Sequence, residues 1–159
     1  MKSMEREKIL PTLKEISQRH DEVIAVYLYG SYAHGTPRAG SDIDVGILFA
    51  PSVPDTLKAS FCLETEIDKS LGMFKTEVAN LNDGSLRLRA EVLIAGIRVF
   101  CRDHDTRAKF EFNTMREWWD EKYWHDSYNR EYFSSLKGNF TDDQRRAYKR
   151  ARQTLAVSS

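Results

Sequence analysis

The sequence predicts a mixed α/β fold, with a small sheet of about four strands flanked by helices. Two observations predict it. Short runs of β-branched and aromatic residues alternate along the chain with longer segments of helical periodicity. Gly- and Pro-containing breakers separate the two kinds of segment. The 159 residues suffice for one domain with a core that needs no disulfide or metal.

The first expected element is a helix over residues 3–20, because Ile9, Leu13 and Ile16 fall on one stripe. Pro11 weakens this prediction locally, and a helix that begins only near Pro11 is the alternative. The elements expected next are a strand over 23–29, a helical turn and loop over 31–40, a strand over 43–49, a helix over 55–71 ending at Gly72, a strand over 74–81, a helix over 85–95, a strand over 97–101, one or two aromatic-rich helices over 105–134, and a last helix from Thr141.

Composition narrows the class of protein. Apolar residues make up 41% and charged residues 30%, and the formal net charge is zero. This balance is typical of a globular protein and argues against a dedicated nucleic-acid binder, which usually carries a basic excess. The last helix, 141–156, holds a local basic run that could contact RNA or an acidic partner; a solvated face is the simpler interpretation.

The cysteines and the apolar runs indicate the cellular compartment in which we expect the protein. Cys62 and Cys101 lie in apolar contexts without CxxC spacing, so we expect both to be reduced core residues. No apolar run approaches the ~18–20 residues needed to span a membrane, and the charged N-terminus lacks the apolar core of a signal peptide. We therefore expect a cytoplasmic protein.

Two acids interrupt the second strand. Because side chains alternate along a strand, Asp42, Asp44 and Gly46 share one face, and the face of Ile43 and Val45 is expected in the core. Two neighbouring carboxylates repel each other unless a cation lies between them. Hard oxygen ligands of this kind suit Mg²⁺, and Gly46 would leave room for something bulky to approach.

Gly30 and Ser31 end the first strand. Ten residues separate Ser31 from Asp42. A glycine at a strand end lets the backbone approach a phosphate closely, and the following turn directs N–H groups at an anion. Alone, each motif is usually a turn or a solvated strand edge. Together they predict a site for a metal-bound nucleoside triphosphate.

This Gly-Ser, ten-residue, Asp-Ile-Asp spacing resembles the signature of the DNA polymerase β-like nucleotidyltransferases. The chain is similar to their minimal members (MNT), and to the MntA-type antitoxins that pair with HEPN-domain toxins. The resemblance covers about residues 5–133, including TEVANLN at 76–82 and RAEVLIAGIRVFCRD at 89–103. It implies a nucleotidyltransferase core over 1–104 and a helical C-terminal extension over 105–159 in the same domain. The last helix, 141–156, either packs with that domain or stands apart from it.

The resemblance also implies a mechanism. A third carboxylate of the family, usually Asp, corresponds here to Glu77, and the second Asp of that run is Asn80. Asp42, Asp44 and Glu77 would be the catalytic and metal-binding residues for two Mg²⁺ ions, and Gly30 and Ser31 would bind the phosphates of ATP. In the MntA group, AMP passes to a tyrosine hydroxyl of the HEPN toxin and silences its RNase activity.

Several alternatives stay open. Glu77 could instead be an ordinary surface residue. The enzyme could act on a small molecule such as an aminoglycoside, although only about 55 residues follow the core. A binding-only antitoxin is the third possibility. Phe112, Met115 and Trp119 keep helical spacing in the aromatic-rich segment. Core packing is the simpler interpretation of these side chains, and a partner-docking surface is the other.

Overall fold

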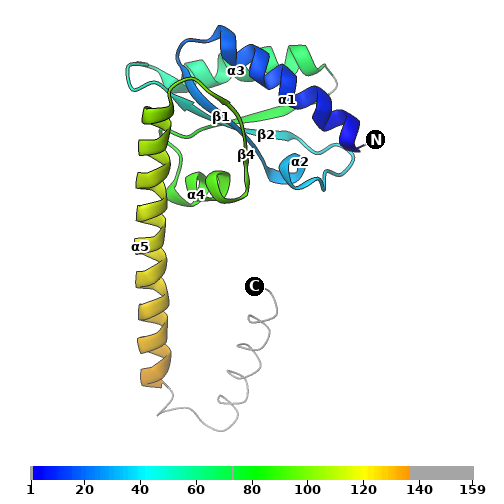
Figure 1. The fold of residues 1–159 in the computed structure, drawn as a ribbon. Coiled ribbons are helices and arrows are strands. Elements are labelled where there is room, and N and C mark those ends of the chain that lie inside the picture. The colour runs from blue at the N-terminus through cyan, green and yellow to red at the C-terminus, as the bar shows by residue number, and fades with distance from the viewer. Residues whose placement is uncertain (1, 73, 137–159) are drawn as a thin grey trace. The chain divides into compact units, whose positions relative to one another are not determined.

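The computed structural model describes residues 2–72 and 74–136, and the helix expected over 141–156 lies outside them. The mixed α/β prediction is confirmed (Figure 1). In chain order the elements are α1 (Lys2–Arg19), β1 (Val23–Tyr29), α2 (Gly30–His34), β2 (Ile43–Phe49), α3 (Thr56–Leu71), β3 (Thr76–Asn80), α4 (Leu86–Ala95), β4 (Ile97–Cys101) and α5 (His104–Leu136).

The four strands form one mixed sheet in the order β3-β2-β1-β4. Strand β1 is antiparallel to both β2 and β4, whereas β2 and β3 are parallel. A parallel neighbour requires a crossover connection, and α3 supplies it. Strands β1 and β2 are therefore the central pair, and β3 and β4 are the edges.

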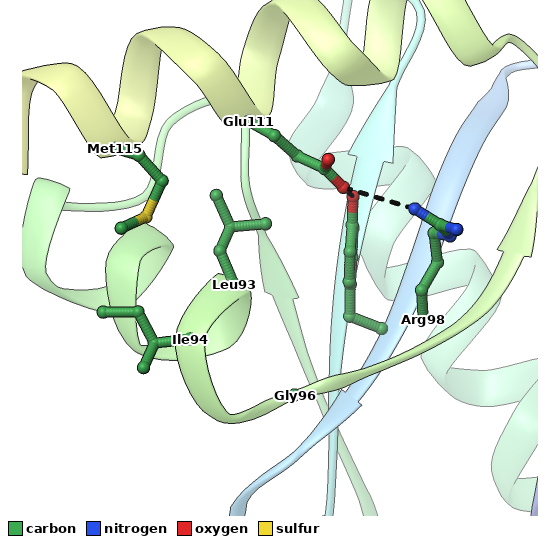
Figure 2. A pocket seen from close by; sticks show the side chains of 7 residues that line it. Leu93, Ile94, Gly96, Arg98, Glu111 and Met115 are labelled. Atoms are coloured by element: carbon green, nitrogen blue, oxygen red, sulfur yellow. Dashed lines mark hydrogen bonds and ion pairs between the residues drawn. The ribbon is translucent and has the colours of Figure 1, made fainter.

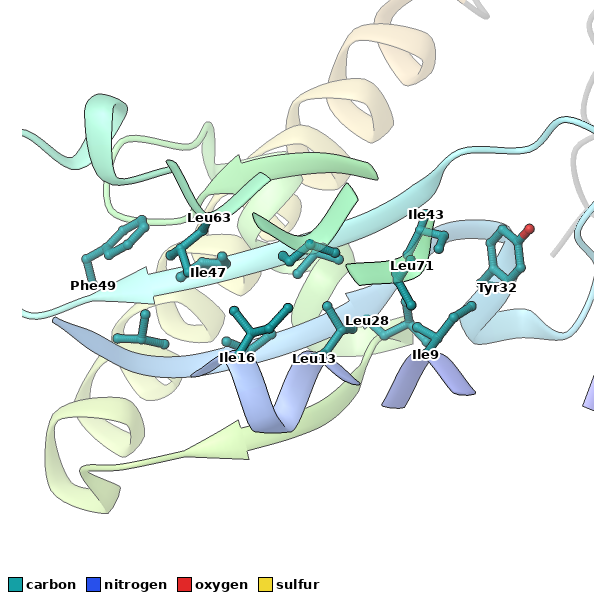
Figure 3. Close-up of a cluster of buried hydrophobic side chains, with 14 residues drawn as sticks. Ile9, Leu13, Ile16, Leu28, Tyr32, Ile43, Ile47, Phe49, Leu63 and Leu71 are labelled. Atoms are coloured by element: carbon teal, nitrogen blue, oxygen red, sulfur yellow. The ribbon is translucent and has the colours of Figure 1, made fainter. Parts of the chain in front are cut away.

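One face of the sheet is covered by α1 and α3 (Figures 1 and 3). The stripe predicted on α1, Ile9, Leu13 and Ile16, is at most 2% exposed. It packs on the alternating residues of β1 and β2 together with Leu63, Ile67 and Leu71 of α3. This face is the larger core, because two amphipathic helices cover it.

The opposite face of the sheet is also buried. Tyr27 and Tyr29 of β1 and Leu48 of β2 cluster there with Val92 of α4 and with Phe110 near the start of α5. Leu48 is only 3% exposed, although it shares the face of the acids. Residues of α4 and of the first part of α5 thus cover part of the face that carries Asp44.

The chain divides into two compact units, and the second begins at Trp119, inside α5. The first part of α5 belongs to the first unit with the sheet. A boundary between core and extension at 104/105 stays a prediction. Among the residues that the structure describes, no helix combines the length and apolarity needed to cross a bilayer.

The helix predicted over 3–20 is present with Pro11 inside it, and the segment predicted as one or two helices is a single helix, α5. Other predictions, on which residues are buried, are wrong. Both cysteines are free, but neither belongs to the core: Cys62 is exposed and Cys101 is half-buried. Cys62 lies off the buried stripe of α3. Core packing is also wrong for Phe112 and Trp119, which are 66% and 55% exposed.

Arg102, just after β4, ties the end of α1 to the sheet. Its guanidinium donates to the backbone carbonyls of Ser17, Gln18, His20 and Val23 at 3.0–3.3 Å. The carbonyls at the end of a helix lack partners within the helix, and a cation there also matches the helix dipole. The planar fork of an arginine can meet several such acceptors at once.

We expect Arg102→Ala to lower the free energy of unfolding by about 1–3 kcal/mol, because several carbonyls lose a charged donor. Arg102→Lys should recover only part of this loss, since an ammonium group lacks the fork. Urea unfolding followed by circular dichroism measures both. Arg116→Ala, at an exposed position of α5, is the matched control and should unfold like wild type. Equal stability of wild type and Arg102→Ala would contradict the assignment.

His20 lies between two carboxylates at the same corner. Its Nε2 is 2.7 Å from Glu66 Oε2, and its Nδ1 is 3.1 Å from Glu22 Oε1. Burial alone would lower the pKa of His20, but the hydrogen bonds to Glu66 and Glu22 outweigh it and the pKa is raised. The folded state therefore holds the imidazolium more strongly than the unfolded chain does.

This raised pKa predicts a pH dependence of stability. The contribution of His20 should be complete below its ordinary pKa of about 6.5 and should disappear as the pH rises through the higher folded value. His20→Gln should therefore flatten the fall in unfolding free energy between about pH 6 and 8. Urea midpoints across that window test it, and an unchanged slope in the variant would count against the two hydrogen bonds.

Candidate active site

The strand register brings the predicted acids together at the start of β2. Asp44 of β2 pairs with Glu77 on β3 and with Tyr29 on β1. Asp42 stands two residues earlier, directly before β2 begins, so alternation places it on the same face. Asp44 and Glu77, which are 33 positions apart in the chain, thus become neighbours because α3 returns the chain parallel to β2.

Asp44 is the electrostatic centre of this cluster. It is half-buried, and burial raises its pKa; the charges of Glu77, Asp42 and Glu91 raise it further. Like charges close to a carboxylate disfavour its ionised form, which is why these three neighbours act on Asp44. The site therefore carries concentrated negative charge, which a cation would stabilise.

Gly30 meets Asp44 directly. Its φ of +64° lies in the left-handed region, and a Cβ atom there would overlap the Asp44 carboxylate. Any other residue would therefore incur both backbone strain and a steric clash. Gly30 lets the first turn of α2 lie against the acid. The close approach of this backbone to a phosphate stays a prediction.

Ser31 stands in that first turn. Helix α2 begins after Tyr29, and no side chain caps it through a hydrogen bond. The first N–H groups of a helix have no partners within the helix, and they favour anions. At the other end of α2, the His34 ring donates from Nδ1 to the Gly30 carbonyl at 2.7 Å, which steadies the turn.

Sequence reasoning missed two residues of this site. Glu91 of α4 raises the pKa of Asp44, so it is a fourth carboxylate within electrostatic reach. Tyr29 is buried, and its pKa rises to about 12 through burial and the charges of Asp44, Glu77 and Glu91. The strand pattern marks Tyr29 as buried but not as the partner of Asp44, and no motif marks Glu91.

The expectation for Gly46 is wrong. A Cβ atom there would lie 3.1 Å from Val92 Cγ1 and 3.3 Å from the methyl groups of Leu81. The space beside Gly46 is therefore filled by the protein's own α4 and by the residue after β3. Gly46 allows close helix packing rather than access for a ligand.

Asn80 has a structural role at the end of β3. Its amide donates to Thr56 Oγ1 and to Asp83 Oδ2, and its carbonyl oxygen accepts from the N–H of Asn82. These bonds tie β3 to the start of α3 and to the following turn. Asn80 has a neutral side chain, so it contributes these hydrogen bonds and adds no charge to the acidic cluster.

The donor set fits a divalent cation by chemistry. Asp42, Asp44 and Glu77 offer carboxylate oxygens, which hard cations prefer. Burial raises the pKa of Asp44 most, and a cation would neutralise the neighbouring negative charge that raises it further. No three His, Cys, Asp or Glu side chains converge closely enough to form a ready metal site in the described part of the chain. Side-chain rotation would have to complete the coordination.

The Gly30 contact predicts unequal effects of two glycine substitutions. Gly35→Ala should lower stability by about 1–2 kcal/mol, because Gly35 has a φ of +71° but open space around it. Gly30→Ala should lose more, because the same strain is joined by the clash with Asp44. Thermal unfolding of both variants measures the difference, and equal losses would contradict a contact between Gly30 and Asp44.

Comparison with solved structures shows a common fold. A toxin–antitoxin structure with AMP-PNP superposes with a TM-score of 0.60 and 21% identity, covering 80% of this chain and 98% of the other. The MntA–HepT toxin–antitoxin structure gives 0.55 and 18% identity, covering 82% and 98%. The complex of a tri-AMPylated Shewanella oneidensis HEPN toxin with its MNT antitoxin gives 0.55 and 19%, covering 84% and 99%.

A search of curated proteins found no match. The family model described as polymerase beta, nucleotidyltransferase, matches residues 11–105, more than half of the chain. That range contains Gly30, Ser31, Asp42, Asp44 and Glu77 in one continuous match. The acids, the glycine turn and the sheet that aligns them therefore belong to one recognised architecture, and this chain is a member of the polymerase β-type nucleotidyltransferase family.

Proposed function

We propose that this protein is an antitoxin enzyme that transfers AMP from ATP to a tyrosine hydroxyl of a partner HEPN toxin in the cytoplasm and thereby neutralises it. The observation that carries the proposal is the pairing of Asp44 with Glu77 across the strands, with Asp44 lying against the Gly30 turn. Carboxylates next to the first turn of a helix are suited to a triphosphate with its cation.

The reaction is a nucleotidyl transfer. The acceptor hydroxyl oxygen forms a bond to the α-phosphorus of ATP, the bond from that phosphorus to the bridging oxygen breaks, and pyrophosphate leaves with the electron pair. The hydroxyl proton passes to a carboxylate of the cluster or to water. The α2 turn at Gly30 and Ser31 would hold the terminal phosphates, so the chain contributes mainly position and charge.

Asp42, Asp44 and Glu77 would hold Mg²⁺, with two ions expected, and the metal would neutralise phosphate charge and lower the pKa of the acceptor hydroxyl. Glu77 is one methylene longer than the aspartate usual in the family, so its carboxylate can cross from β3 toward Asp44, its strand partner. Tyr29 is held neutral by its raised pKa, and its hydroxyl can donate a hydrogen bond beside the acids.

The protein acceptor is supported by structural neighbours. One neighbour contains AMP-PNP, an ATP analogue, and another contains a HEPN toxin that carries AMP groups beside its MNT antitoxin. These chains match this one over nearly their whole length. A small-molecule acceptor and neutralisation by contact alone are the alternatives that the experiment must separate.

We expect transfer of one or a few AMP units to the product of a neighbouring HEPN gene, in the presence of Mg²⁺ and ATP. Intact-mass spectrometry of both proteins measures it. Asp42→Asn combined with Asp44→Asn should abolish transfer, because the charge that holds the cation is removed. Asp120→Asn, at an exposed position of α5, is the matched control and should transfer normally.

The outcomes distinguish the alternatives. A tight complex with no mass change, which neutralises the RNase equally well when formed with the double variant, would support neutralisation by contact. No complex with the partner, together with transfer to an aminoglycoside, would support the small-molecule enzyme. Mapping the modified residue by fragmentation tests the tyrosine, and AMP on another residue type would overturn that part.

A further inference from the structure

A second concave site lies on the same side of the sheet as the acids but shares no lining residue with them. This pocket, between β1, the end of α4, the start of β4 and the first part of α5, has a volume of about 420 Å³. Figure 2 shows its lining side chains, which include Tyr27, Leu93, Ile94, Arg98, Glu111 and Met115. Its size is in the range of small-molecule sites.

One wall of the pocket is polar: Tyr27, Arg98 and Glu111 line it, and Arg107, which is not a lining residue, contacts Glu111. The Tyr27 hydroxyl donates to Glu111 Oε1 at 2.7 Å. Arg98 Nη1 lies 3.8 Å from that same oxygen, and Arg107 Nη1 lies 3.4 Å from Oε2. Two guanidinium groups thus face one carboxylate, while burial and the bond to Glu111 raise the pKa of Tyr27 and keep the phenol neutral.

The two arginines are not equivalent. Arg107, the closer partner of Glu111, is half-buried, with its side chain 15% exposed, whereas the Arg98 side chain is 45% exposed. A separation of 3.8 Å from Glu111 is too long for a hydrogen bond. Because a guanidinium has five N–H donors, Arg98 retains donors for another acceptor in the pocket.

The other wall is apolar. Leu93 and Ile94 of α4 face Met115 of α5 across the opening (Figure 2). Ile94 is 60% exposed, so its side chain offers apolar surface to a ligand in the pocket. Met115 adds a flexible, polarisable surface that adapts to flat apolar groups.

We propose that this pocket binds a small organic anion, a carboxylate attached to a flat apolar body, with Arg98 as the partner of the carboxylate. The apolar body would lie between Ile94 and Met115, and the carboxylate would point toward β4. A cationic ligand would be opposed by Arg98, because Glu111 is already engaged by Tyr27 and Arg107, and a neutral one would forgo a charge-assisted hydrogen bond.

The pocket is separate from the nucleotide site proposed above. Tyr27 pairs with Gly46, which Val92 and Leu81 cover, whereas the acids lie at Tyr29 and beyond. Helix α4 contributes to both regions, with Glu91 influencing the acids and Ile94 lining the pocket. The inference therefore does not depend on the proposed reaction, and each can fail without the other.

The test is isothermal titration of the full chain with three probes of one shape and different charge: 1-naphthylacetate, 2-(1-naphthyl)ethanol and 1-naphthylmethylammonium. We expect saturable binding of the carboxylate, and binding weaker by about tenfold or more for the other two. Arg98→Ala should weaken carboxylate binding by a similar factor and leave binding of the alcohol unchanged. Arg116→Ala, at an exposed site on α5, should bind like wild type.

Several results would overturn the proposal: no saturable binding to wild type, equal affinity for the carboxylate and the alcohol, or unchanged affinity in Arg98→Ala. Displacement of 1-naphthylacetate by ATP would also overturn it, because the pocket would then be part of the nucleotide site. Thermal unfolding checks that Arg98→Ala is folded. If Arg98→Ala is not folded, Arg98→Gln, which keeps most of the side-chain length and loses the charge, replaces it in the titration.

Discussion

The contact between the Gly30 backbone and the Asp44 carboxylate is the constraint on which the site depends. It joins the end of β1, the start of α2 and the middle of the acidic cluster at one point. Two independent features, a left-handed φ and the absence of a side chain, meet at that one residue. Because the Gly30 turn lies so close to Asp44, the first turn of α2 and the acidic cluster lie beside each other. A triphosphate with its cation needs that combination, since it presents negative phosphates and a positive metal within a few ångströms.

The remainder of the first compact unit holds this point in place. Like charges on neighbouring strands oppose folding locally, so the strands that carry them must be stabilised elsewhere. Ile43, Val45 and Ile47 alternate with the functional face and are at most 1% exposed. The edge strand β3, which carries Glu77, is also fixed by α3: Asp68 and Glu64 accept from the N–H groups of Thr76 and Val78. Those bonds satisfy donors that would otherwise form an open sheet edge. Acids of α3 thus position the strand whose own acid belongs to the site.

The sequence predicts local features of the fold well, because they depend on neighbouring residues. The stripe of Ile9, Leu13 and Ile16, the alternation in β2 and the glycine turn all follow from short-range rules. The errors arise where distant segments meet. Gly46 looks like room for a ligand until α4 returns to place Val92 over it. Cys62 and Phe112 look apolar enough for the core, but helix rotation turns them outward. Glu91 could not be found at all, because its effect on Asp44 depends on how α4 packs against the sheet.

The same face of the sheet therefore carries two chemistries of opposite sign. At the start of β2, carboxylates of β2, β3 and α4 concentrate negative charge around Asp44. Two residues along β1 from Tyr29, Tyr27 belongs to a cluster in which arginines outnumber acids. The apolar layer of Leu48, Leu81 and Val92 lies on this face beside the central strands. Such a layer screens charge less than water does, so each field acts strongly on the groups close to it. A cation and an anion would thus be attracted to different places on one sheet, and α4 contributes residues to both.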